Sequence, residues 1–217
     1  MDVIAFVHAK GTSTRVPAKN KRLLGDIPLF CHAIKNALAS KLVTKVVIDS
    51  DNADILRIGQ ELGAEPLKRD SSLANNSTTG DDLMYWQASN YPNSDIVLQV
   101  IPTAPFIKPQ SIDEAISRLC DTGVNSVFGA YKEALYTWSK GTPDYYKKGK
   151  ILNSFDLTPI EYETTGLYIN KTDFVLRDRK RLDCGSYSMF FLSKLESFDI
   201  NTEEDFKLAE ILYRGML

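Results

Sequence analysis

Apolar runs alternate with amphipathic segments at a short, regular pace along the first part of the chain. Residues 2–8, 45–49 and 95–101 predict buried strands, and residues 28–38, 53–62 and 81–90 predict helices with Pro28 opening the first. Gly63 suits the cap that ends the second of these helices. Strands and helices alternating at this spacing are typical of βαβ units, so we expect an α/β fold built on a parallel sheet.

The second half of the chain continues this pattern with one interruption. Residues 111–120 predict a helix with Ser111 as N-cap and Glu114 completing a capping box, and a strand is expected at 124–130. From about 131 to 162, aromatic residues and lysines alternate with turn residues, which favours a protruding β-rich insertion. The core resumes at 166–169, a short helix is expected at 171–176, and a helix over 202–212 is expected to be capped by Thr202. We expect a single domain spanning 1–217.

Composition excludes several classes of protein. The net charge of −2 argues against a general electrostatic grip on nucleic acid. No apolar run approaches the ~20 residues that a membrane span requires, and the N-terminus has the character of a strand and not of a signal peptide. Three scattered cysteines and two histidines argue against a disulfide framework and a zinc site. A cytoplasmic protein without membrane or nucleic-acid partners is therefore expected.

The loop HAKGTSTRVPAKN, residues 8–20, follows the first predicted strand and is suited to an anion. In open α/β sheets, ligands bind beyond the carboxyl ends of the strands. Gly11 lets the backbone approach a ligand, and Ser13 and Thr14 add amides and hydroxyls. The loop's positive charge comes from Lys10, Arg15 and Lys19. A phosphate site and a solvated basic loop fit this pattern equally well, since neither a Walker A loop nor a GxGxxG fingerprint is present.

Further polar residues occur at other strand ends. Asp199 and Asn201 lie two apart before the last helix, where both could reach one hard cation, although ordinary capping explains them as well. Asp49 and Asp51 allow a second metal pair, but capping of the following helix is the favoured interpretation. His8 is expected to be a hydrogen-bonding residue of the core or loop.

In family order, these segments resemble the cytidylyltransferases that activate 3-deoxy-ulosonic acids: the acylneuraminate enzymes, their pseudaminate and legionaminate relatives and, more distantly, the 3-deoxy-manno-octulosonate enzymes. Residues 9–20 (AKGTSTRVPAKN) are similar to the opening signature ARxGSKxxPxKN. The segments IPTAP (101–105), GLYI (166–169) and SFDINTEEDFKLAE (197–210) resemble QPTSP, GAxYI and SIDIDTxxDFxxAE. The resemblance runs over nearly the whole chain, and its segments are jointly specific.

The resemblance implies a Rossmann-like nucleotidyltransferase (GT-A-like) three-layer sandwich with a small β-rich dimerisation insertion at about 131–162. It also implies that the anomeric hydroxyl of an acidic sugar attacks the α-phosphate of CTP, with Mg²⁺ offsetting charge as pyrophosphate leaves. A homodimer is implied, and the aromatic residues Tyr136, Trp138, Tyr145 and Tyr146 suit its interface better than a sugar platform.

Site residues are carried over by position. The catalytic set is Lys10, Arg15 and Lys19. The nucleotide-binding set is Ala9, Gly11, Ser13, Thr14, Asn20, Arg69, Asn76, Thr78 and Gly80. The sugar-binding set is Ile101, Thr103 and Ala104, and the Mg²⁺ ligands are Asp199 and Asn201.

The chain departs from the family pattern at four positions, where Lys10 replaces Arg, Thr14 replaces Lys, Ile101 replaces Gln and Asn201 replaces Asp. We expect a sialate-like nonulosonate acceptor over an octulosonate. The departures leave two alternatives: a cytidylyltransferase acting on a phosphonate or phosphate acceptor, and a catalytically silent nucleotide-binding relative.

Overall fold

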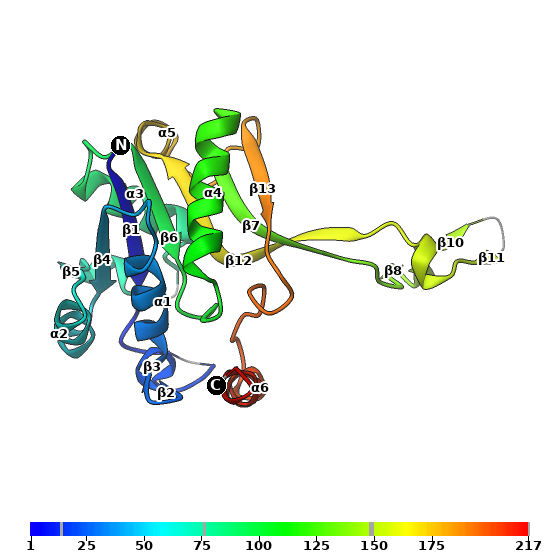
Figure 1. Ribbon diagram of the computed structural model, residues 1–217, viewed down its shortest axis with the longest axis horizontal. Coiled ribbons are helices and arrows are strands. Elements are labelled where there is room, and N and C mark those ends of the chain that lie inside the picture. The colour runs from blue at the N-terminus through cyan, green and yellow to red at the C-terminus, as the bar shows by residue number, and fades with distance from the viewer. Residues whose placement is uncertain (14, 76, 148–149, 217) are drawn as a thin grey trace.

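A seven-stranded sheet with the order β13-β7-β12-β6-β1-β4-β5 forms the centre of the molecule (Figure 1). The computed structural model describes residues 1–13, 15–75, 77–147 and 150–216. The strands of the sheet are β1 (Val3–His8), β4 (Lys45–Ser50), β5 (Glu65–Lys68), β6 (Ile96–Val100), β7 (Ser126–Glu133), β12 (Ile160–Lys171) and β13 (Tyr187–Phe191). The neighbours β6, β1, β4 and β5 are parallel, as the alternating pattern predicts, and β12 enters antiparallel between β6 and β7.

Helices cover both faces of the sheet because the strands are apolar on both sides. The helices are α1 (Leu29–Leu38), α2 (Ala53–Glu61), α3 (Gly80–Asn90), α4 (Pro109–Thr122), α5 (Thr172–Asp178) and α6 (Glu203–Arg214). In β1, Val3, Ala5 and Val7 join a core with α1, α2 and α4, whereas Ile4 and Phe6 join a core with α3 and α5. This alternation of period two gives the three-layer arrangement its two hydrophobic cores.

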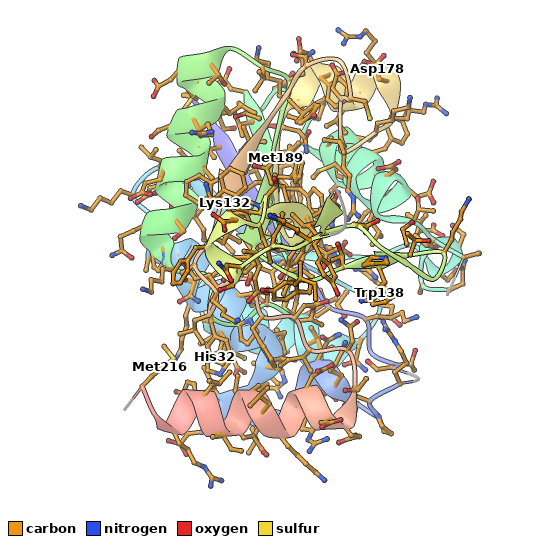
Figure 2. The ribbon with its side chains drawn as sticks, turned by 90° about the vertical axis from the view of Figure 1, so that its right-hand side faces the viewer. His32, Lys132, Trp138, Asp178, Met189 and Met216 are labelled. Carbon is orange, nitrogen blue, oxygen red and sulfur yellow. The ribbon has the colours of Figure 1, made fainter. Side chains whose placement is uncertain are left out.

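A third, smaller core ties the N-terminal loop to the C-terminal helix. Val16 of the loop, Leu24 of the short hairpin β2 (Leu23–Leu24) and β3 (Ile27–Pro28), and Phe206 of α6 are all fully buried in it. Figure 2 shows α6 crossing the end of the molecule, with Met216 just beyond it. Residues from the two ends of the chain are thereby held against each other.

An arm built from residues 134–147 and 150–159 protrudes far from the sheet (Figure 1). Its elements are short: β8 (Trp138–Ser139), β9 (Thr142–Pro143), β10 (Tyr146–Lys147), β11 (Lys150–Ile151) and the 3₁₀ turn η3 (Ser154–Asp156). Phe155 is 99% exposed and Trp138 is 62% exposed. The arm occupies the segment for which the sequence predicts a protruding β-rich insertion. Among the helices described, none has the length and apolarity to cross a membrane.

The helix ends confirm one sequence prediction and correct another. Thr202 caps α6 in a capping box with Asp205, as predicted. Ser111 is not an N-cap: α4 begins at Pro109 after Lys108, since proline is favoured in the first turn of a helix. The Ser111 hydroxyl donates instead to the buried carboxylate of Glu196.

Candidate active site

Three polar segments far apart in the sequence meet at the backbone of Ile200. Lys19 Nζ donates to the Ile200 carbonyl at 2.7 Å, and the Ile200 amide donates to the Thr103 carbonyl at 2.9 Å. The loop 8–20, the turn 101–104 and the segment 199–201 therefore form one site at the carboxyl edge of the parallel strands, as expected for an open α/β sheet.

Backbone and side-chain bonds fix the course of loop 8–20. The Gly11 amide donates to Asp51 Oδ1 at 2.8 Å, and Asn20 Nδ2 donates to the Lys10 carbonyl at 2.8 Å. A Cβ on Gly11 would lie 2.8 Å from Asn52 Cβ, so only glycine fits here. Ala9 and Asn20 are buried. These two buried residues pack beneath the loop. Ser13, in the loop, is half-buried.

Lys19 is held at the centre of this site by a short 3₁₀ turn, η1 (Lys19–Lys21). The preceding residue, Ala18, has a φ of 50°, a left-handed conformation that is costly without glycine. Burial lowers the pKa of Lys19, and the charge of Arg15 lowers it further, while Asp199 opposes the shift. Arg15 is exposed and makes no ion pair with the residues that the structure describes.

Asp199 and Asn201 face each other beside Lys19. Asn201 Nδ2 donates to Asp199 Oδ2 at 2.6 Å, so the two side chains are in contact. Asp199 Oδ1 is buried and has no hydrogen-bond partner within the described chain. An orphaned buried carboxylate oxygen is costly, and a bound cation would remove that cost.

The oxygen atoms of Asp199 and Asn201 could supply part of the coordination shell of a cation whose other ligands come from a substrate. No group of three or more His, Cys, Asp or Glu side chains among the described residues could hold a metal ion. Mg²⁺ is commonly bound by one or two carboxylates together with phosphate oxygens and water. Asp199 Oδ1 and the amide oxygen of Asn201 are suitable for such a partial site.

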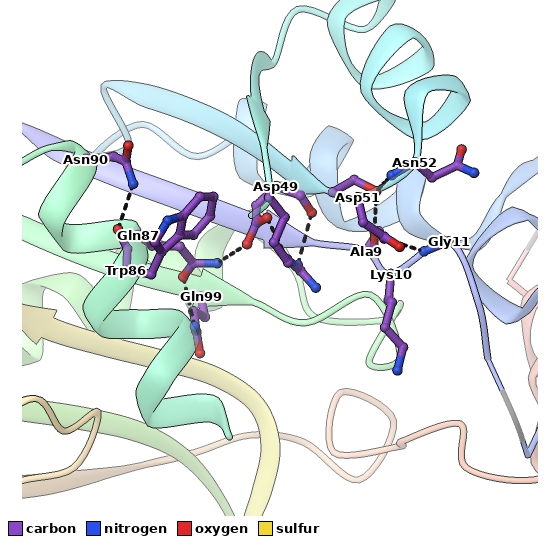
Figure 3. A network of polar contacts seen from close by, with 12 residues as sticks. Ala9, Lys10, Gly11, Asp49, Asp51, Asn52, Trp86, Gln87, Asn90 and Gln99 are labelled. Carbon is purple, nitrogen blue, oxygen red and sulfur yellow. Dashed lines mark hydrogen bonds and ion pairs between the residues drawn. The ribbon is translucent and has the colours of Figure 1, made fainter. Parts of the chain in front are cut away.

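Arg69 belongs to a buried polar network whose members Asp49, Gln87 and Gln99 are labelled in Figure 3. Its Nε donates to Asp49 Oδ1 at 2.8 Å, and Gln87 Nε2 donates to Asp49 Oδ2 at 2.7 Å. Gln99 Nε2 then donates to Gln87 Oε1 at 2.8 Å. Arg69 is 5% exposed, and Asp49, Gln87 and Gln99 are fully buried. The network spans β4, α3 and β6 and fixes the Arg69 guanidinium in one position.

This network corrects the interpretation of Asp49 and Asp51 as capping residues. Asn52 caps α2, accepting from the amides of Asp54 and Ile55. Asp49 is instead the counter-ion of Arg69, and Asp51 holds Gly11. An asparagine directly before the helix can accept from its first free amides, whereas Asp49 still belongs to β4 and points into the sheet's α3 face.

His8 ends β1 between these two regions. Its side chain is half-buried, and its Nδ1 is buried and has no hydrogen-bond partner within the described chain. Desolvation of the ring and the nearby charges of Arg69 and Arg181 lower its pKa to about 3. The imidazole is therefore neutral at physiological pH and adds no charge to the site.

The remaining predicted residues flank these two regions. Gly80 is the first residue of α3, and the Thr78 amide donates to Asn75 Oδ1 at 2.9 Å in the preceding loop. Ile101 and Ala104 close the turn after β6 with a backbone hydrogen bond of 3.0 Å. Thr14 and Asn76 lie outside the described residues.

Sequence reasoning missed Asp49, Gln87 and Gln99 as parts of the site. The sequence does carry a signal for Gln99. It is a polar residue within the apolar run of β6, so its buried side chain requires hydrogen-bond partners. Gln87 carries no such signal, because a glutamine in a helix is usually exposed.

A family described as "Cytidylyltransferase" matches residues 4–208. The chain is 27% identical to the CMP-N,N'-diacetyllegionaminic acid synthase of Legionella pneumophila, covering 98% of this chain and 96% of that one. It is 23% identical to the N-acylneuraminate cytidylyltransferase of Oncorhynchus mykiss over 96% of its length but spans only 49% of that relative.

Solved structures share the fold. The CMP:2-keto-3-deoxy-manno-octonic acid synthetase complexed with CTP superposes with a TM-score of 0.76 and 14% identity, with both chains fully covered. This likeness confirms the predicted Rossmann-like nucleotidyltransferase fold. The role of the arm in dimerisation stays a prediction.

Proposed function

The chain belongs to the cytidylyltransferase family, and on that premise we propose that it transfers CMP from CTP to the anomeric hydroxyl of a sialate-like nonulosonate, releasing pyrophosphate. The observation that carries the proposal is the convergence at Ile200. A half-buried lysine lies there beside a carboxylate, one oxygen of which has no hydrogen-bond partner in the part of the chain that the structure describes. The relatives named for legionaminic and acylneuraminic acids support the choice of sugar.

In the proposed reaction, the sugar oxygen bonds to the α-phosphorus while the bond from that phosphorus to the bridging oxygen of pyrophosphate breaks. Catalysis of this kind depends on positioning and on charge complementary to the transition state. Lys19 donates to phosphate oxygens in place of the Ile200 carbonyl, and Lys10 and Arg15 add positive charge. The backbone of Gly11 and the polar groups of Ser13 and Thr14 line the triphosphate.

Asp199 and Asn201 would hold the divalent cation, which we propose to be Mg²⁺, through Asp199 Oδ1 and the Asn201 amide oxygen. When bound, it would offset the charge that builds up on the phosphates. The Asn201 amide keeps Asp199 Oδ2 engaged, so that Oδ1 alone remains directed toward the cation.

The nucleoside end of CTP is proposed to lie at Arg69 and the loop before α3. Arg69 is fixed by Asp49 without any ligand, so it requires no rearrangement to bind. Asn20, Asn76, Thr78 and Gly80 complete this nucleoside side, and Ile101, Thr103 and Ala104 form the wall for the sugar.

We further propose that the chain is a cytoplasmic homodimer that pairs through the arm. The exposed aromatic side chains of Trp138 and Phe155 support this, because aromatic residues are enriched in interfaces. Sedimentation of the protein and of the double variant Trp138→Ser/Phe155→Ser tests it: a dimer that becomes a monomer is expected, and an unchanged dimer contradicts the arm's role.

Turnover with a panel of acceptors tests the proposed function. The protein is incubated with CTP, Mg²⁺ and legionaminate-type, pseudaminate-type, sialate and octulosonate acids, and pyrophosphate release is measured. Release with a nonulosonate is expected. Binding of CTP without turnover on any acid would contradict the proposal and favour a catalytically silent relative.

A further inference from the structure

Arg181 lies in the loop between α5 and β13, and its guanidinium packs over a tyrosine ring of the central sheet. The Arg181 Cζ lies 3.9 Å from the centre of the Tyr168 ring, and that ring is fully buried in β12. Tyr168 pairs in register with Gln99 of β6. A guanidinium stacked on a ring keeps its N–H groups at the edge, where they can still bind a planar anion.

The guanidinium has no protein acceptor among the residues that the structure describes. Its backbone amide donates to Asp81 Oδ1 at 3.1 Å, but its side chain makes no hydrogen bond or ion pair there. Glu163, another carboxylate of this region, accepts from the Tyr168 hydroxyl. None of its nitrogen atoms is among the buried side-chain atoms that lack a partner, so these N–H donors reach solvent and are available to a ligand that carries oxygen acceptors.

The surroundings of Arg181 place its charge at the site. The guanidinium lies against Gly80, the first residue of α3, so that a Cβ there would collide with it. Its charge contributes to the lowered pKa of His8 at the end of β1. Both Arg181 and Asp199 influence the pKa of Tyr168, which burial raises. Arg181 thus faces the same edge of the sheet as the candidate active site.

The proposed reaction involves two anions, the triphosphate of CTP and the carboxylate of the sugar. The residues assigned so far provide positive charge only for the triphosphate. The triphosphate meets the cations of loop 8–20, while the sugar wall of Ile101, Thr103 and Ala104 carries no charge. Strand β12 flanks this wall: the Ile101 amide donates to the Gly166 carbonyl at 2.9 Å, and a Cβ on Gly166 would lie 2.7 Å from Ala104 Cβ. Tyr168 and its stacked arginine follow two residues later on the same strand.

We propose that Arg181 binds the carboxylate of the acceptor sugar and selects acidic acceptors. This inference rests on the proposed function and deepens it by assigning a recognition residue to the acid group. A paired guanidinium–carboxylate contact of this kind is charge-assisted and bidentate, which neither a lysine nor an amide reproduces.

Steady-state kinetics on Arg181→Gln, Arg181→Lys and the control Arg179→Gln test the proposal. Arg179 is a cation of the same loop that lies over Tyr85 at 4.7 Å, so the control removes an equal charge and a similar stacking contact. For Arg181→Gln we expect KM for the acid to rise about 10- to 100-fold, with KM for CTP within about twofold of the parent value. Arg181→Lys should lie between, and Arg179→Gln should match the parent protein.

A second arm uses a carboxamide analogue of the acceptor, in which the acid group is neutral. The parent protein should prefer the acid about 10- to 100-fold, and Arg181→Gln should lose that preference. Circular dichroism and melting temperature verify that each variant is folded.

Outcomes separate the two proposals. Unchanged KM for the acid in folded Arg181→Gln, or an equal rise in KM for CTP, would overturn the assignment of Arg181 while leaving the proposed function standing. Absence of pyrophosphate release by the parent protein with any acid would overturn the proposed function, and this inference would fall with it.

Discussion

The two ends of the candidate site are built in opposite ways. At one end, Arg69 is buried, paired with Asp49 and supported by Gln87 and Gln99 before any ligand arrives. At the other end, Lys19 is half-buried and donates to the Ile200 carbonyl, beside an Asp199 oxygen that has no hydrogen-bond partner among the described residues. One end is held by a buried ion pair, with Gln99 Oε1 left without a hydrogen-bond partner within the described chain, and the other end is open and electrostatically incomplete.

This difference indicates that the two ends of the site have different functions, one in recognition and the other in catalysis. A satisfied buried pair holds a side chain still and contributes to recognition, at the cost of depending on every member of the network. An incomplete cluster gains its missing partners only when substrate and cation bind, so its charges are available to stabilise developing negative charge. We therefore expect substitutions at Arg69's network to affect stability and those at Lys19 to affect turnover.

The largest expected effect is on folding, through the closed end. Asp49→Leu leaves the Arg69 guanidinium buried without a counter-ion, and we expect the free energy of unfolding to fall by about 3–5 kcal/mol. Urea denaturation measures this. The double variant Asp49→Leu/Arg69→Met should recover most of the loss, and a single variant as stable as the parent protein would show that the network is not closed.

Lys19→Met should leave the fold intact and remove turnover. Loss of one charge that acts in the transition state costs about 10²- to 10³-fold in kcat, or about 3–4 kcal/mol. The control is Lys21→Met, an exposed lysine of the same 3₁₀ turn. Comparable loss of turnover in both variants would contradict the specific role of Lys19.

A pH effect on stability arises at His8, between the two ends. The folded-state pKa is about 3 and the unfolded value is near 6.5, so the unfolded chain takes up a proton that the folded chain does not. Stability is therefore complete above pH 6.5 and is lost as pH falls toward 3, by up to ~1.4 kcal/mol per pH unit from this residue. Denaturation of His8→Asn at pH 7.5, 6 and 5 should give a flatter dependence, and an equal slope would contradict this account.

The smallest expected effect concerns the open end. Asn201→Asp adds a carboxylate beside Asp199, where a divalent cation would be held more strongly. We expect the Mg²⁺ concentration for half-maximal turnover to fall about fivefold, equivalent to ~1 kcal/mol. Titration of Mg²⁺ at saturating CTP checks this, and a rise in that concentration would exclude Asn201 from the cation site.

The sequence predicts the elements whose signals are local. Strand periodicity locates β1, β4 and β6, and the pair Thr202 and Asp205 locates the start of α6, because each depends on neighbours along the chain. The convergence of loop 8–20 with 199–201 follows in outline, since strand ends of a parallel sheet meet at one edge.

The closed network could not be predicted in the same way. Asp49, Gln87 and Gln99 come from β4, α3 and β6, and only the packing of α3 on the sheet brings them together. Ser111 resembles an N-cap because Glu114 follows it at capping-box spacing, but Pro109 starts the helix two residues earlier. Arg181 likewise could not be predicted as a binding residue, because only the structure shows its contact with Tyr168.

The central claim is that CMP is transferred to a sugar hydroxyl, and ³¹P NMR of the reaction mixture tests it most directly. With CTP, Mg²⁺ and a nonulosonate, we predict that the three CTP resonances give way to pyrophosphate and a single phosphodiester resonance. A pair of coupled resonances from a new phosphoanhydride, which a phosphate or phosphonate acceptor would produce, or an unchanged CTP spectrum, would contradict the account.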